Sequence, residues 1–200
     1  LLYNITELTQ SGGIMKKFIL ASGSPRRKEI LLREGYAFEI MKSDKEDAFD
    51  KNCPAEKFSV RCALSKARDV YSRVPKTSVV LGADTVVALG GEILGKPENR
   101  EEAEEMLRRL SGKTHRVTTG YALFAENFSE TGSVTTEVEF EDLPEQTIKA
   151  YLDSGLWQGK AGAYGIQDGF PLVKSFSGDR DNVVGLPISA IKSTLDLLLK

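Results

Sequence analysis

Residues 17–35 constrain the fold most strongly, because they place a strand pattern, a tight turn and a helical pattern in direct succession. The apolar run 18–21 is typical of a buried strand, and Pro25 opens a helical pattern that ends at Gly35. Ser24 is suited to the N-cap, because its side chain can accept a hydrogen bond from a backbone N–H of the first turn. The sequence therefore predicts a β-strand that leads directly into a helix N-terminus.

Three cations occupy the first turn of this helix: Arg26, Arg27 and Lys28. The N–H groups of a first turn already make that end positive, so each cation is opposed there by about 0.3–1 kcal/mol. A glycine turn with backbone N–H groups and arginine forks suits a phosphate or carboxylate group, with Ser22 and Ser24 as further contacts. The alternative is a solvated basic surface that binds no ligand.

A second helical pattern, between Asn99 and Gly112, has the opposite charge order. Acids fill its first turn and Arg108 and Arg109 its last turn, as the helix dipole favours. Asn99 and Glu102 have the spacing of a capping box. The contrast favours a functional role for the cations of the first helix.

The remaining patterns mix strands and helices. Further strands are predicted over residues 36–41, 78–83, 116–125, 133–141 and 172–176, and further helices over residues 54–71, 144–154 and 187–200. Phe38 and Ile40 are expected to lie on one face of their strand. A polar turn is predicted over residues 127–132, and a loop is predicted over residues 178–187. This order predicts an α/β fold with a mixed, largely antiparallel sheet and flanking helices.

Gly90 and Gly91 interrupt an apolar run that ends at residue 94, as in a two-residue hairpin. The turn sets a register in which Leu89 lies opposite Glu92. If the ladder continues, Thr85 pairs with Lys96, and Lys96 then meets the neighbouring Asp84. An acid and a lysine are thus expected to converge.

Glycines recur at positions 155, 159, 162, 165 and 169, around Lys160, Tyr164 and Gln167. This density suits close approach of the backbone to a ligand. The spacing is not that of a dinucleotide-binding fingerprint.

Composition narrows the class of protein. The 200 residues are 40% hydrophobic and 28% charged, and the net charge of -2 argues against a general nucleic-acid binder. No apolar run approaches the roughly 20 residues that span a membrane, and no segment resembles a signal peptide, so a cytoplasmic protein is expected. Residues 1–14 are interpreted as an upstream extension, and residues 15–200 as a single domain.

Six motifs recur together in one known family. They begin at Ser22 (Ser-Gly-Ser-Pro-Arg-Arg), Gly82 (Gly-Ala-Asp-Thr-Val-Val), Gly95 (Gly-Lys-Pro), Leu110 (Leu-Ser-Gly-Lys-Thr-His), Lys160 (Lys-Ala-Gly-Ala-Tyr-Gly-Ile-Gln) and Val183 (Val-Val-Gly-Leu-Pro). In this order they resemble the Maf family of nucleoside triphosphate pyrophosphatases. The resemblance implies an elongated fold of the inosine-triphosphate-pyrophosphatase type, with two lobes around a cleft. It also implies hydrolysis of a nucleoside triphosphate to the monophosphate and pyrophosphate, and commonly a homodimer.

The resemblance also implies roles for single residues. Asp84 matches the family's catalytic aspartate. Arg26, Thr85 and Gln167 match the positions that set substrate preference, and together they resemble the branch that prefers thymidine and uridine triphosphates. Two alternatives stay open: the branch that prefers N7-methylated guanosine triphosphate, and a nucleotide-binding regulator of cell division.

A divalent cation, usually Mg²⁺ with Mn²⁺ as the alternative, is implied near Asp84. Glu46 and Asp47 match a pair of acids near the metal, often two glutamates, so the shorter Asp47 leaves its share in coordination open. Lys66 and Lys96 match lysines that line the cleft. With Arg26 and Arg27 they are candidates to hold phosphate groups.

Two further residues are interpreted separately. At Arg180 many relatives carry an aromatic residue, and its role is open. His115, the sole histidine, is interpreted as a hydrogen-bonded structural residue at a strand start in preference to a proton-transfer group.

Overall fold

The structure is a computed structural model that describes residues 16–45, 50 and 53–200. The predicted extension, residues 1–14, and the predicted metal ligands Glu46 and Asp47 therefore lie outside the described residues. Within the described part, no helix combines the length and the apolar character that crossing a membrane requires.

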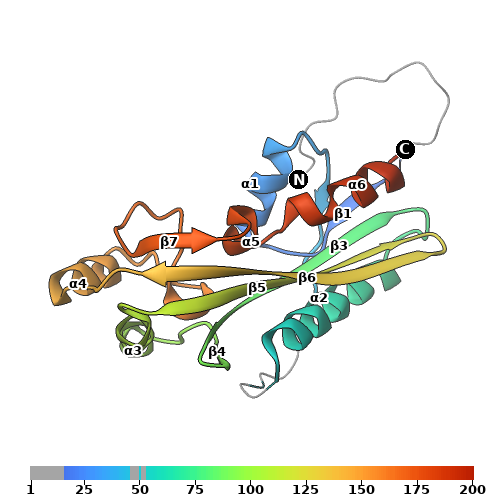
Figure 1. The fold of residues 1–200 in the computed structure, drawn as a ribbon. Helices are drawn as coiled ribbons and strands as arrows, with labels where there is room; N and C mark the ends of the chain where they lie inside the picture. The colour runs from blue at the N-terminus through green and yellow to red at the C-terminus, as the bar shows by residue number, and fades with distance from the viewer. Residues whose placement is uncertain (1–15, 46–49, 51–52) are drawn as a thin grey trace.

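Seven strands form one mixed sheet, flanked by helices (Figure 1). The strands are β1 (Phe18–Leu20), β2 (Glu39–Ile40), β3 (Val79–Leu89), β4 (Glu92–Leu94), β5 (Thr114–Ala125), β6 (Phe128–Phe140) and β7 (Val173–Ser177). The helices are α1 (Pro25–Arg33), α2 (Ala55–Ser72), α3 (Arg100–Leu110), α4 (Glu145–Asp153), α5 (Arg180–Val184) and α6 (Ile188–Leu198), with a 3₁₀ turn η1 (Ala161–Ala163).

The sheet has the order β2-β1-β3-β5-β6-β7, and β4 also pairs with β3. β1 runs parallel to both β2 and β3, and every other pairing in the described sheet is antiparallel. The prediction of a mixed, largely antiparallel sheet is confirmed. The long strands β3, β5 and β6 form its twisted body (Figure 1).

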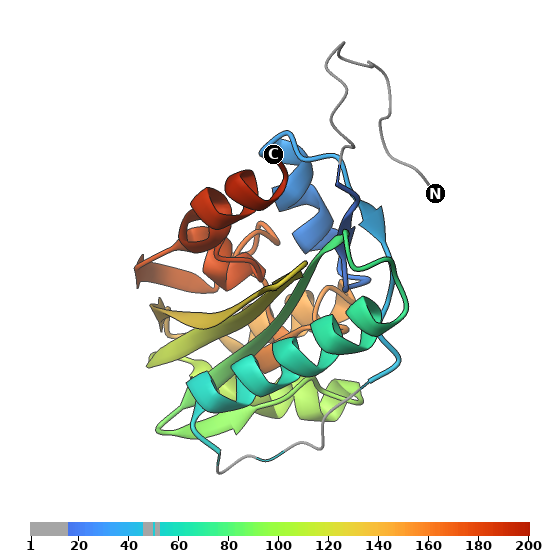
Figure 2. The ribbon, with the colours of Figure 1, turned by 90° about the vertical axis from the view of Figure 1, so that its right-hand side faces the viewer.

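Successive side chains of β3 point to opposite faces of the sheet and show which helices cover each face. Val80 packs with Ala67 of α2, whereas Leu81 packs with Ile191 of α6 and with α1. Figure 2 shows α2 lying along one face while α1 and α6 cover the other. A second large core lies at the far end of the sheet, where α3 and α4 pack.

Two glycines let α2 lie close to the sheet. A Cβ atom on Gly82 of β3 would stand 2.4 Å from the carbonyl oxygen of Ala63, and one on Gly120 of β5 would stand 2.3 Å from the carbonyl carbon of Ser59. Asp84 pairs directly with Gly120 in the β3–β5 ladder. The residues around Asp84 are therefore held against α2 at backbone contact.

One edge of β3 is interrupted. β1 pairs with β3 as far as Leu81, and β4 begins to pair at Val87, while β5 occupies the other edge from Val80 to Ala88. Among the described strands, none pairs with residues 82–86 along the interrupted edge. Asp84 and Thr85 thus lie in the interior of a long strand, not at the expected strand end, and a gap in the sheet edge exposes them.

Three predicted boundaries are wrong. The loop predicted over residues 178–187 contains α5. The turn predicted over residues 127–132 comprises only residues 126–127, with Asn127 in the left-handed region, because β6 already begins at Phe128. β2 is two residues long, and Phe38 is buried while Ile40 is exposed, because this short outer strand leaves the core within a few residues.

The two predicted caps also differ in detail. Ser24 occupies the N-cap of α1, but its side chain accepts no capping hydrogen bond, and its own N–H donates to the Ser22 hydroxyl at 3.2 Å. Asn99 caps α3 by accepting from the N–H of Glu102. The Glu102 carboxylate accepts from the N–H of Glu98 at 2.9 Å instead of closing the box on Asn99.

Candidate active site

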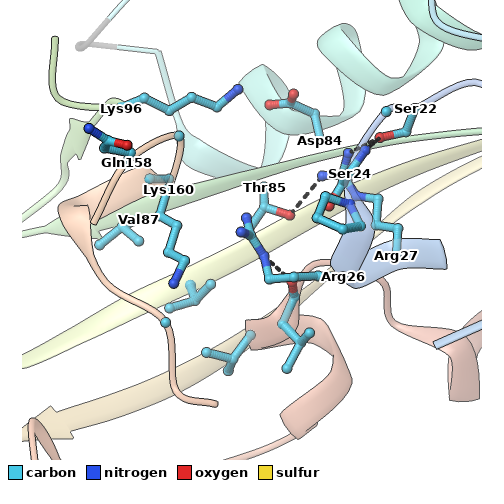
Figure 3. A pocket seen from close by; sticks show the side chains of 18 of the residues that line it. Ser22, Ser24, Arg26, Arg27, Asp84, Thr85, Val87, Lys96, Gln158 and Lys160 are labelled. Carbon is cyan, nitrogen blue, oxygen red and sulfur yellow. Dashed lines mark hydrogen bonds between the residues drawn. The ribbon is translucent and has the colours of Figure 1, made fainter. Parts of the chain in front are cut away.

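A cavity of about 540 Å³ opens at the gap in β3 (Figure 3). Its wall joins the turn before α1, the exposed part of β3, the segment after β4 and the glycine-rich segment. All nine predicted site residues that the structure describes line it: Ser22, Ser24, Arg26, Arg27, Lys66, Asp84, Thr85, Lys96 and Gln167. The tertiary fold therefore brings together residues that are up to 145 positions apart in the sequence.

The charge of the cavity wall is strongly positive. Its described lining contains six basic residues and one acid, Asp84. The basic residues are Arg26, Arg27, Lys42, Lys66, Lys96 and Lys160. This composition suits a ligand with several negative charges, such as a polyphosphate.

Asp84 points toward α2 and forms an ion pair with Lys66. The two side chains are 16% and 22% exposed, so the pair is reachable from the cavity. Figure 3 shows the side chain of Lys96 extending toward Asp84. Lys96 and Asp84 thus converge as predicted, but the lysine that forms the ion pair with Asp84 is Lys66.

The predicted pairing of Thr85 with Lys96 is not made. The hairpin register is confirmed at Leu89 and Glu92, but β4 ends at Leu94. The next carbonyl, that of Gly95, accepts from the N–H of Gly162 at 3.0 Å. The chain thus leaves β3 to contact the glycine-rich segment, which creates the gap at which the cavity opens.

Arg27 is half-buried in the cavity wall and holds its neighbours in place. Its guanidinium donates to the Gly185 carbonyl at 2.7 Å, to the Ser22 hydroxyl at 2.9 Å and to the Thr85 hydroxyl at 3.1 Å. Burial lowers the pKa of Arg27 to about 10, against the opposing effect of Asp84, so the group stays charged at neutral pH. Its donors are directed largely at the protein, and its first role is to hold Ser22 and Thr85 in place.

The C-terminus of α5 explains why α1 tolerates cations in its first turn. Arg26 donates to the Val184 carbonyl at 3.3 Å, and Arg27 donates to the neighbouring Gly185 carbonyl. Carbonyl groups at a helix C-terminus carry partial negative charge, which stabilises cations. The protein thus supplies part of the negative charge that the sequence predicted. Burial lowers the pKa of Arg26, while Asp168 and other nearby groups oppose that shift.

The Thr85 hydroxyl has a defined hydrogen-bond direction. Thr119 donates its only hydroxyl proton to the Asn182 carbonyl at 2.8 Å, so in the 2.9 Å contact between the two threonine hydroxyls Thr85 is the donor. Thr85 also accepts from Arg27. Its proton is used inside the protein, and toward the cavity it can offer a lone pair.

Sequence reasoning missed four polar lining residues: Lys42, Ser43, Gln158 and Lys160. Lys42 lies over the turn before α1, where a Cβ on Gly23 would stand 2.3 Å from its Cε. Only the glycine density around Lys160 could have indicated that residue. Lys160 forms a buried ion pair with Asp168, and the two side chains are 9% and 5% exposed.

His115 and Arg180 do not line the cavity. His115 is buried, and its Nε2 lies 2.7 Å from the hydroxyl of Tyr164. Burial lowers the pKa of His115 to about 4, which keeps the ring neutral at physiological pH and agrees with a structural role. Arg180 is the exposed first residue of α5.

The donor set at the cavity fits a magnesium ion that shares its ligands with a substrate. Within the described residues, no group of three or more His, Cys, Asp and Glu side chains is placed to hold a metal. Mg²⁺ is often held by one or two carboxylates together with substrate phosphates and water. Asp84 supplies one such carboxylate.

Comparison with known proteins places this geometry in a family. The sequence model of the family described as Maf-like protein matches residues 17–198. A dTTP/UTP pyrophosphatase of Thermococcus kodakarensis is 48% identical over 174 residues, which cover 86% of this chain and 92% of that protein. Proteins of the same name from Pyrococcus furiosus and Bacillus cereus are 44% and 45% identical, and the alignments cover 92% and 94% of this chain and 96% and 92% of those proteins.

A crystal structure of a nucleoside-triphosphatase, also described as a dITP/XTP pyrophosphatase, from Mycobacterium abscessus aligns with a TM-score of 0.43 at 14% identity. That alignment covers 92% of this chain and 98% of the other, and a likeness at this level carries no inference about activity. The family match spans nearly all of the described residues and includes every described lining residue of the cavity. The chain belongs to the Maf-like protein family.

Proposed function

We propose that this protein is a nucleoside triphosphate pyrophosphatase that hydrolyses dTTP and UTP to the monophosphate and pyrophosphate. The observation that carries the proposal is the cavity at the β3 gap, where the described lining places one carboxylate among six cations. Relatives with 44–48% identity bear the name dTTP/UTP pyrophosphatase. A triphosphate supplies the negative charge that this lining lacks.

In the proposed reaction, water attacks the α-phosphorus and the bond from that phosphorus to the bridging oxygen breaks. Asp84 accepts the proton of the attacking water, because it is the carboxylate of the described cavity lining and its ion pair with Lys66 is partly exposed. Pyrophosphate departs with the bridging oxygen and its electron pair. Lys66, Lys96 and Arg26 stabilise the charge that develops on it.

A divalent cation, Mg²⁺ or alternatively Mn²⁺, is part of the proposal. When bound it would neutralise charge on the phosphate oxygens. Asp84 would provide a carboxylate oxygen. Glu46 and Asp47 stay predicted ligands outside the described residues.

Base preference is assigned to Arg26, Thr85 and Gln167. All three line the cavity, and the Thr85 hydroxyl faces it as an acceptor.

A homodimer and a cytoplasmic location, both expected from the sequence, belong to the same proposal. Sedimentation of the purified protein measures whether it forms a dimer.

The test is a panel of triphosphates assayed with Mg²⁺, in which pyrophosphate and orthophosphate are measured separately. We expect stoichiometric pyrophosphate, fastest from UTP and dTTP and slower from CTP, ATP, GTP and N7-methyl-GTP. The Asp84→Asn variant is the matched control for contaminating activity. Release of orthophosphate alone, or equal rates for the two proteins, would refute the proposed reaction, and a preference for N7-methyl-GTP would refute the base assignment.

A further inference from the structure

Asp168 lies next to Gln167 and is held by three donors of its surroundings. The hydroxyl of Tyr151 donates to Oδ2 at 2.5 Å, and the amine of Lys160 contacts both carboxylate oxygens, Oδ1 at 2.5 Å. The Nε2 of Gln167 donates to Oδ1 at 3.2 Å. Gln167 and Lys160 line the cavity, whereas the Asp168 side chain is buried behind them.

This arrangement fixes which end of the Gln167 amide faces Asp168. A carboxylate paired with a lysine can only accept hydrogen bonds, so the NH₂ end of the amide must be the end that faces it. The carbonyl oxygen of Gln167 is therefore directed away from Asp168.

Gly165 provides the space for this contact. A Cβ on Gly165 would stand 2.6 Å from the Gln167 Nε2 and 2.7 Å from the Asp168 Oδ1. The N–H of Asp168 in turn donates to the Gly165 carbonyl at 3.1 Å, which closes a tight turn around both side chains. The backbone and the carboxylate thus hold the amide together.

We propose that Asp168 is a positioning residue that orients the Gln167 amide so that its carbonyl oxygen reads a hydrogen-bond donor on the pyrimidine. This inference rests on the proposed function. Uracil and thymine carry an N–H at N3, flanked by two carbonyl acceptors. Cytosine carries a lone pair at N3, which a carbonyl oxygen repels. The orientation set by Asp168 therefore favours UTP and dTTP over CTP.

The experiment measures binding, so that it does not depend on turnover. The α,β-imido analogues of UTP and CTP, which resist cleavage at the α,β position, are titrated into the protein with Mg²⁺ in a calorimeter. The quantity compared is the ratio of the two dissociation constants. A general disturbance of the cavity weakens both analogues, whereas a change in amide orientation moves the ratio.

In Asp168→Asn, the new amide can donate as well as accept, so the Gln167 amide is free to turn over. We expect the preference for the UTP analogue to fall by about tenfold, the effect of one hydrogen bond. Gln167→Met should lose the preference to a similar extent. Asp168→Asn added to Gln167→Met should change the ratio no further, because the residue acts through the amide.

Tyr151→Phe is the matched control. It removes one donor to Asp168 but leaves the carboxylate and its contact with Gln167, so the ratio should stay as in the wild type. If Asp168→Asn alone fails to fold because it leaves Lys160 unpaired, Lys160→Gln combined with Asp168→Asn removes both charges. The same loss of preference is expected from it.

An unchanged ratio in the Asp168 variants, or an Asp168 effect that persists without the Gln167 amide, would overturn the inference. So would a Gln167→Met variant that keeps the full preference. Failure of the proposed function has a different signature, because the wild-type protein would then release no pyrophosphate from UTP even where the binding ratios behave as expected.

Discussion

At the scale of single residues, Asp84 combines a protected position with chemical access. Two close glycine contacts hold its strand against α2, and the gap in the β3 edge opens its side chain to the cavity. Lys66 balances its charge from α2. The carboxylate is therefore fixed by its strand and its ion pair, yet it is partly exposed to the cavity.

Asp84→Asn should lower kcat for UTP by roughly 10²–10⁴-fold, because the amide keeps the shape of the side chain but cannot accept a proton. The imido analogue of UTP should still bind, since the variant removes a negative charge from an anion site. Pyrophosphate release and calorimetric titration measure the two effects. A variant that retained most of the wild-type kcat would remove Asp84 from the role of base.

The neighbouring arginines should respond differently to substitution. Arg27→Met removes three hydrogen bonds from a half-buried group, so we expect a loss of at least about 2 kcal/mol and a melting temperature lower by at least about 4 °C. Arg26→Ala removes one long hydrogen bond from a half-buried group and should shift the melting temperature by less than about 2 °C. Its KM for UTP should rise instead.

Differential scanning calorimetry without nucleotide, followed by steady-state kinetics, separates the two arginines. The opposite pattern, with Arg26 dominating stability and Arg27 dominating KM, would contradict the division of roles. It would return Arg27 to the role of direct phosphate ligand that its sequence position predicts.

At the scale of elements, α5 links the sheet to α1, and one buried side chain, that of Asn182, anchors it to the sheet. Asn182 is fully buried, donates to the Val117 carbonyl and the Thr136 hydroxyl, each at 2.9 Å, and accepts from the Thr119 N–H at 3.0 Å. The carbonyls at the other end of α5 hold Arg26 and Arg27. Five residues are too few to form a helix on their own, so these tertiary contacts maintain it.

Asn182→Ala should therefore destabilise the protein by at least about 2 kcal/mol, because it leaves buried backbone groups of β5 without partners. Amide exchange at Thr119 should accelerate more than exchange elsewhere in β5, which a hydrogen-exchange measurement resolves. Arg33→Ala is the control. Arg33 also joins α1 to α5, by an ion pair with Asp181 at 2.5 Å, but its side chain is 52% exposed and the expected loss is below about 1 kcal/mol. Equal losses for the two variants would contradict the anchoring role.

At the scale of the whole molecule, local sequence patterns predicted the features that depend on neighbouring residues, namely the hairpin register and the positions of most helices. The hairpin register at Leu89 and Glu92 follows from the glycine turn, and apolar periodicity together with the residues that start and end helices located α2, α3, α4 and α6. The gap in β3 was not predictable, because it depends on where β1, a strand distant in the sequence, and β4, the second strand of the hairpin, stop pairing with β3. α5 is too short for a helical period, and its anchor, Asn182, looks in sequence like a turn residue.

The candidate site divides in the same way. The three cations in the first turn of α1 indicated the anion site. The roles predicted for Asp84, Thr85 and Gln167 came from the motifs that resemble the family. Lys42 reaches the cavity only through the tertiary fold, and no sequence pattern indicates it, whereas the glycine density around Lys160 was the one local signal for that residue. The contacts of Arg27 within the protein could not be predicted, because its partners Thr85 and Gly185 lie 58 and 158 residues away.

The single histidine gives the folded molecule a defined dependence on pH. His115 is buried next to Tyr164 and packs edge-on against Phe140, and burial lowers its pKa from 6.5 to about 4. Because the folded pKa is lower than the unfolded one, the unfolded chain binds more protons between these values. Stability is therefore fully present above about pH 6.5 and is lost as the pH falls toward about 4.

Between about pH 7 and about pH 5 this linkage should lower the free energy of unfolding by about 2 kcal/mol, equivalent to a fall in melting temperature of about 4–8 °C. The comparison is between wild type and His115→Gln, which cannot titrate in this interval, with urea unfolding measured at several pH values. His115→Gln should be less stable at neutral pH, yet its stability should change little from about pH 7 to about pH 5, where carboxylates are still largely ionised. If both proteins lost stability in parallel, the histidine would contribute nothing to the pH dependence.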